Sequence, residues 1–135
     1  MFANSDDEEG ERVPIKYTLE EKGDFIQVTA DDTTEDVQAL LDYIDAVIAK
    51  SEELGIGRIL MDHRKLIFSE DIALTYDLAL QCVDRFSVDR PLKVSLVARP
   101  ERMEAARIYE SIGINRGVEL KAFDRLKMAA TWLKT

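Results

Sequence analysis

The sequence predicts a single α/β domain built on a mostly parallel β-sheet. Short apolar segments alternate along the chain with longer segments whose apolar residues recur at helical spacing. Its 135 residues, 46% hydrophobic and 33% charged, are enough for one soluble domain with its own core. Strands that alternate with helices form parallel sheets through crossover connections. We therefore expect five strands and four helices in the order β-β-α-β-α-β-α-β-α, with an antiparallel first strand.

The first two strands form a predicted hairpin. Ile15, Tyr17 and Leu19 alternate with polar residues, which is the period-two pattern of a half-buried strand. The Lys-Gly-Asp sequence at 22–24 is typical of a turn, and residues 25–30 supply the second strand.

The first helix follows Thr33 and Asp36, a hydroxyl and an acid at capping-box spacing. Its apolar face is formed by Val37, Leu40, Leu41, Ile44, Val47 and Ile48. Gly55 is suited to end this helix, and residues 58–62 are apolar enough for a buried central strand.

The remaining elements continue the alternation. Ser69, followed by two acids, is expected to cap the second helix. Residues 92–98 form another central strand, and Pro100 suits the first position of the third helix. Residues 117–123 alternate as an edge strand, and Asp124 is expected to cap the last helix.

Composition excludes several functional classes. The net charge of −9 lies mainly in the first half, and no basic stripe offers a surface for nucleic acid. No apolar run approaches the roughly 20 residues of a membrane span. The acidic residues 1–13 resemble a disordered tail rather than a signal peptide, and residues 14–135 form the domain. One cysteine, Cys82, permits no internal disulfide, so we expect a cytoplasmic protein.

Asp62 and His63 follow the third strand, where open α/β sheets place ligand sites. An acid and an imidazole could act in proton transfer, but neighbours on a strand point to opposite faces. The sequence also has no second histidine for a metal site and no nucleophile motif. We therefore predict no catalytic residue, no metal and no cofactor, and interpret His63 as a surface loop residue.

The segment after His63 has two further features. Arg64 and Lys65, with Arg99 after the next strand, could converge to bind a phosphate or carboxylate, or could be solvated loop charges. Three successive apolar residues at 66–68 are unusual in the loop expected there. With an additional apolar stripe at 74–82, they form either plain core or a site for a partner, a second copy or a ligand. The candidate binding surface comprises Asp62, His63, Arg64, Lys65, Leu66, Ile67, Phe68, Ser69, Leu74, Leu78 and Arg99.

Two stretches of the chain resemble a known family. The apolar strand that ends in Asp62, and the Phe123-Asp124 turn followed by Ala129 and Trp132-Leu133, are similar to the SpoIIAA-like branch of the STAS superfamily. This group is also described as STAS/SEC14-like. The resemblance extends over nearly the whole chain, although its motifs are short and mostly structural.

The resemblance implies a compact, non-enzymatic regulatory or protein-interaction module, with a homodimer as one form. Better-known members are anti-sigma-factor antagonists that are phosphorylated on a serine at a helix start, within an Asp-Ser-Ser-Gly-like turn. Asp62 matches the acid and Ser69 lies near the serine's place, but there is no Ser-Gly pair, and Glu70 and Asp71 would repel a phosphate. The SEC14-like side of the resemblance implies the alternative, a carrier or sensor of a small apolar or lipid-like ligand.

Overall fold

The computed structural model describes residues 13–68 and 72–135, with side-chain surroundings described outside 68–75. The expected tail at 1–13 lies almost entirely outside these residues. The expected cap at Ser69 lies outside them as well.

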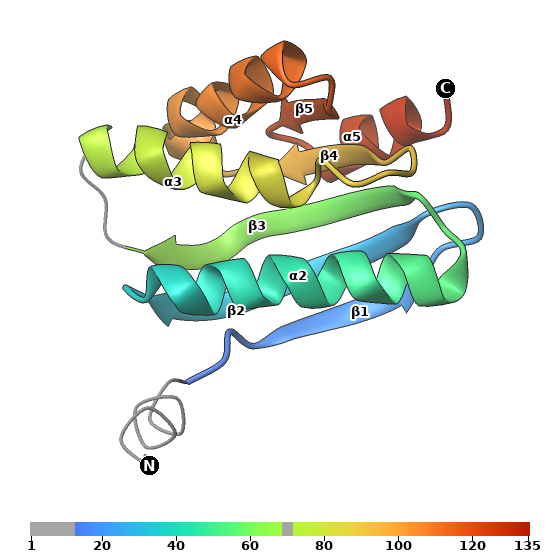
Figure 1. The fold of residues 1–135 in the computed structure, drawn as a ribbon, viewed down its shortest axis with the longest axis horizontal. Coiled ribbons are helices and arrows are strands. Elements are labelled where there is room, and N and C mark those ends of the chain that lie inside the picture. The colour runs from blue at the N-terminus through green and yellow to red at the C-terminus, as the bar shows by residue number, and fades with distance from the viewer. Residues whose placement is uncertain (1–12, 69–71) are drawn as a thin grey trace.

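The described residues form one five-stranded sheet, as predicted (Figure 1). The strands lie in chain order, β1-β2-β3-β4-β5, with β1 antiparallel to β2 and every other neighbouring pair parallel. Their bounds are β1 Tyr17–Glu21, β2 Ile26–Thr34, β3 Arg58–Phe68, β4 Lys93–Val97 and β5 Glu119–Phe123.

Four α-helices accompany this sheet in the described parts of the chain, again as predicted. They are α2 Val37–Leu54, α3 Ile72–Arg85, α4 Met103–Asn115 and α5 Leu126–Leu133. Pro100 opens a short 3-10 turn, η1 (Pro100–Arg102), that leads directly into α4.

The helices cover both faces of the sheet. The larger core joins residues of α2, α3 and α4, such as Leu40, Val83 and Ala106, to Ile59 and Val94 on the strands. A smaller core, on the other face, packs Ala129 and Leu133 of α5 against Leu60 and Val97. Connections of one hand between parallel neighbours put successive crossover helices on the same face. The sheet is therefore the middle of three layers (Figure 1).

Two predicted helix caps are wrong, and one predicted helix end is confirmed. The N-cap of α2 is Asp36, whose carboxylate accepts hydrogen bonds from the backbone N–H groups of Gln38 at 3.0 Å and Ala39 at 3.2 Å. Thr33 cannot cap this helix because it still belongs to β2. Arg125 takes the N-cap position of α5 that we expected for Asp124, without a side-chain hydrogen bond. Gly55 ends α2 in the left-handed conformation, at φ 69°.

The prediction of a loop after Asp62 is wrong, because β3 continues through Phe68. This second half of β3 pairs with the end of β2, from Asp31 opposite Lys65 to Thr34 opposite Phe68. The register shifts by one residue between the two halves, which is a β-bulge. A one-residue shift exchanges the two faces of a strand. His63, within the irregular stretch between Asp62 and Lys65, and Leu66 after it face the same side of the sheet.

Candidate functional site

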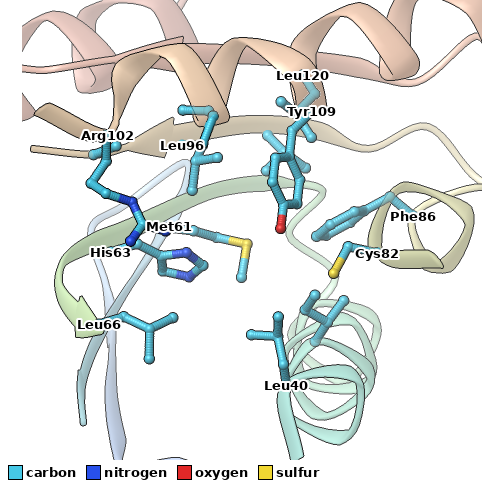
Figure 2. Close-up of a pocket in the computed structure, with 15 residues that line it drawn as sticks. Leu40, Met61, His63, Leu66, Cys82, Phe86, Leu96, Arg102, Tyr109 and Leu120 are labelled. Atoms are coloured by element: carbon cyan, nitrogen blue, oxygen red, sulfur yellow. The ribbon is translucent and has the colours of Figure 1, made fainter. Parts of the chain in front are cut away.

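A pocket lies between the sheet and the three helices α2, α3 and α4 (Figure 2). Its volume is about 80 Å³. Strands β3, β4 and β5 form its floor, and the helices and η1 form its walls. Most of its lining is apolar and includes Leu40, Met61, Leu66, Phe86, Leu96 and Leu120.

His63 is part of this lining, and not the surface loop residue that we expected. The Nε2 atom of its ring lies 2.9 Å from the hydroxyl oxygen of Tyr43, a buried residue of α2. Burial lowers the pKa of His63 to about 4, against the opposing effect of the Asp62 charge. The imidazole is therefore neutral at neutral pH. Its hydrogen bond with Tyr43 fixes the ring at the side of the pocket.

Three further polar groups reach the pocket from the helices. Figure 2 shows Arg102 extending from η1 toward His63, while the hydroxyl of Tyr109 points into the pocket from α4. Cys82 contributes its thiol from α3. Burial raises the pKa of Cys82 to about 12, although a hydrogen bond with Tyr109 acts in the opposite direction. The thiol is protonated at neutral pH, so it lacks the thiolate character that reactive cysteines need.

Asp62 takes part in a different interaction on the opposite face of β3. Its carboxylate accepts two hydrogen bonds from the guanidinium of Arg64, from Nε at 2.8 Å and from a terminal nitrogen at 2.7 Å. Burial alone would raise the pKa of Asp62, but the hydrogen bonds and charge of Arg64 outweigh burial and lower it. Asp62 is thus an ionised partner of Arg64, and Asp62 and His63 project to opposite faces.

Some residues of the candidate binding surface are buried in the structure, and others are exposed. Asp62, Leu66 and Leu78 are buried, and Leu66 lines the pocket, so their part in a binding site stays a prediction. The bulge turns Leu66 inward, and Leu78 belongs to the core-facing side of α3.

Other residues of the candidate binding surface are accessible to solvent. Arg64, Lys65 and Ile67 are exposed. Arg99 is half-buried, and its Nε is buried without a hydrogen bond to the described residues. Convergence of these bases on an anion stays a prediction. The side chains of Phe68 and Leu74, and all of Ser69, lie outside the description.

Sequence reasoning did not assign Tyr43, Met61, Arg102 or Tyr109 to a site. Met61 and Tyr109 carry the ordinary signals of core residues, a central strand and a helical repeat. Tyr43 lies on the buried side of α2, and Arg102 follows Pro100 with no local motif. Only the packing of distant elements brings these side chains to one pocket.

The described residues contain neither a cluster of metal-ligand type nor a helix long and apolar enough to cross a membrane. No protein-family model and no curated protein sequence matches the chain.

Solved structures do match it. An anti-sigma factor antagonist from Mycobacterium paratuberculosis superposes with a TM-score of 0.58 and 19% sequence identity, covering 90% of this chain and 95% of that one. An uncharacterized protein of the DUF3478 family with a SpoIIAA-like fold, from Shewanella loihica PV-4, gives a TM-score of 0.49 at 22% identity, covering 89% and 93%. The chain therefore has the fold of this anti-sigma factor antagonist, in agreement with the predicted fold.

Proposed function

We propose that this chain is a non-enzymatic regulatory module that acts by binding a protein partner. Two exposed apolar side chains carry the proposal: Ile67, near the end of β3, is 45% exposed, and Tyr76, in α3, is 54% exposed. Ile67 lies near the carboxyl end of a central parallel strand, where open α/β sheets bind their ligands, and α3 is the next element along the chain. The same strand end also exposes Arg64 and Lys65, and apolar groups together with basic ones suit the mixed composition of a protein interface.

The fold adds support of a more general kind. An anti-sigma factor antagonist has the same architecture over 95% of its chain. At 19% identity this likeness concerns the fold, and the role of a partner-binding module for this chain is our inference from it. We propose further that the module works in the cytoplasm, which suits a chain whose single cysteine is unpaired.

Replacing each exposed residue by aspartate tests this function. In Ile67→Asp and Tyr76→Asp, a charge at the centre of an interface should abolish self-association in analytical ultracentrifugation or capture of partners on the immobilised protein. Ile114→Asp on α4 is the matched control, since Ile114 is 69% exposed and lies away from this surface. If all three variants associate like the wild type, the surface assignment is wrong.

A second candidate function is a sensor or carrier of a small apolar ligand. The observation that favours it is the pocket itself, whose lining is mainly apolar with a few polar groups. Native mass spectrometry of the freshly purified protein, followed by denaturing spectra of the same sample, tests this function. A small molecule that is released on denaturation would support it, whereas a bare chain that binds none of a set of small apolar compounds would contradict it.

A further inference from the structure

The pocket has two chemically different sides. In Figure 2, Arg102 and His63 lie together on one side, while Phe86 and Cys82 lie on the opposite side. The phenol of Tyr109 projects between them with its hydroxyl inward. A molecule inside would therefore have polar groups near one end and hydrocarbon around the other.

The charge of the polar side is positive. Among the described residues that line the pocket, Arg102 carries the permanent charge and none is acidic. His63 adds no charge near neutral pH, because its ring is neutral there. A guanidinium has five N–H donors in a planar fork, so it can hold a carboxylate while also making a contact within the protein. The polar side thus favours a single negative charge over a cation or an extended neutral chain.

The size of the pocket limits its occupant. A volume of about 80 Å³ admits roughly five to eight atoms of the size of a water molecule, because a cavity needs roughly 10–15 Å³ to hold one water. Pockets for drug-sized ligands measure roughly 300–1,000 Å³, so a long acyl chain does not fit inside. A short aliphatic acid is the largest molecule of suitable polarity that fits this volume.

We propose that this pocket binds a compact monoanionic acid, with its carboxylate on Arg102 beside His63 and its small apolar body toward Phe86 and Cys82. The proposal rests on the ligand-sensor function above and specifies its ligand class. The carboxylate would be recognised by charge-assisted hydrogen bonds in a water-poor setting, where they are strongest. The apolar body would make van der Waals contacts with lining atoms that face empty space when the pocket holds no ligand.

An NMR titration with isobutyrate tests the proposal on the full chain at pH 7. His63 is the only histidine, so its ring protons give one unambiguous signal at the polar side of the pocket. Isobutyramide is the neutral control of nearly the same shape, and octanoate is the control for length. The variants are Arg102→Gln, which removes the charge, and Ala106→Met, which fills the pocket from α4. Arg107→Gln, on the exposed side of α4, is the matched control.

The expected result is saturable movement of the His63 signals by isobutyrate, with binding at least tenfold weaker for isobutyramide and for octanoate. Arg102→Gln should weaken isobutyrate binding at least tenfold, Ala106→Met should abolish it, and Arg107→Gln should leave it unchanged. Equal binding of acid and amide, or an unchanged affinity in Arg102→Gln, would overturn the proposed ligand class while leaving a ligand-binding function in place. Binding of none of the three compounds to the wild type would overturn the proposal, and a bare chain in native mass spectra would then remove the ligand-sensor function too.

Discussion

The ionisation of His63 gives the most direct test of the pocket. The chain has one histidine, and burial lowers the pKa of its ring to about 4 from an ordinary value of 6.5. In the unfolded chain, His63 therefore becomes protonated as the pH falls below 6.5. In the folded chain it becomes protonated only near pH 4. Because the unfolded state binds more protons in this window, the free energy of unfolding rises with pH across it. The contribution of neutral His63 is complete above pH 6.5 and is lost as the pH falls toward 4.

The size of the effect follows from the shift. At about 1.4 kcal/mol per pKa unit, a fall from 6.5 to about 4 corresponds to at most about 3.5 kcal/mol, and to about 2 kcal/mol at pH 5. His63 as a whole residue is half-buried, so solvent lies near the site. Solvent screening reduces the effect, so we expect a loss of about 1 kcal/mol between pH 7 and pH 5.

Urea unfolding at pH 7, 6 and 5 measures this loss, with His63→Gln as the reference. Glutamine can keep a hydrogen bond to Tyr43 but does not titrate, so the difference in slope between the two proteins belongs to His63. An NMR titration of the imidazole signals gives the folded pKa directly. A pKa near 6.5, or equal slopes in both proteins, would show that the ring is solvated and would refute the pocket geometry.

Two further changes test the packing around the site. Ala106→Met should raise the free energy of unfolding by about 1 kcal/mol, since a void of about 80 Å³ costs up to about 2 kcal/mol at roughly 24 cal/mol per Å³ and methionine adapts to irregular space. The urea midpoint should rise at an unchanged m-value, whereas a lower midpoint would mean that no such void exists. Asp62→Asn should lower the free energy of unfolding by about 1–2 kcal/mol at pH 7, because it removes a charged acceptor from Arg64. Since the folded pKa of Asp62 is lowered, this deficit should persist down to the ordinary value of 3.8 and shrink as the pH falls through the folded pKa. A deficit that stays constant down to pH 2 would contradict the ion pair.

The fold was predictable because its signals are local. Helix α2 shows apolar residues at helical spacing and ends at a glycine that adopts a left-handed conformation. The short, continuously apolar start of β3 indicated a central strand. Such patterns depend on neighbours within a few residues and survive in the folded protein.

The second half of β3 was not predictable in this way. Residues 62–65 are all charged or polar, and the apolar run that follows them is out of phase with the first half of the strand. Only the pairing of Lys65 with Asp31, across the bulge, makes this segment a strand. The register between two strands that are distant in the sequence cannot be predicted from the sequence of either strand alone.

The pocket escaped prediction for a related reason. Each apolar residue of its lining carries the sequence signal of an ordinary core position, and the space between them depends on how far α3 and α4 stand from the sheet. Arg102 has no motif of its own, and it joins the site because η1 directs it over the end of β3.

The bulge in β3 also explains why one short segment can serve both candidate functions. Leu66 points into the pocket and is buried, whereas its neighbour Ile67 is 45% exposed. Consecutive residues of a strand face opposite sides, so a ligand inside and a partner outside would contact different side chains of the same backbone. If the two functions are independent, Ile67→Asp should retain isobutyrate binding and Ala106→Met should retain association. If the ligand controls the partner, isobutyrate must bind the associated and free forms with different affinity, and association of the wild type must change when it is added.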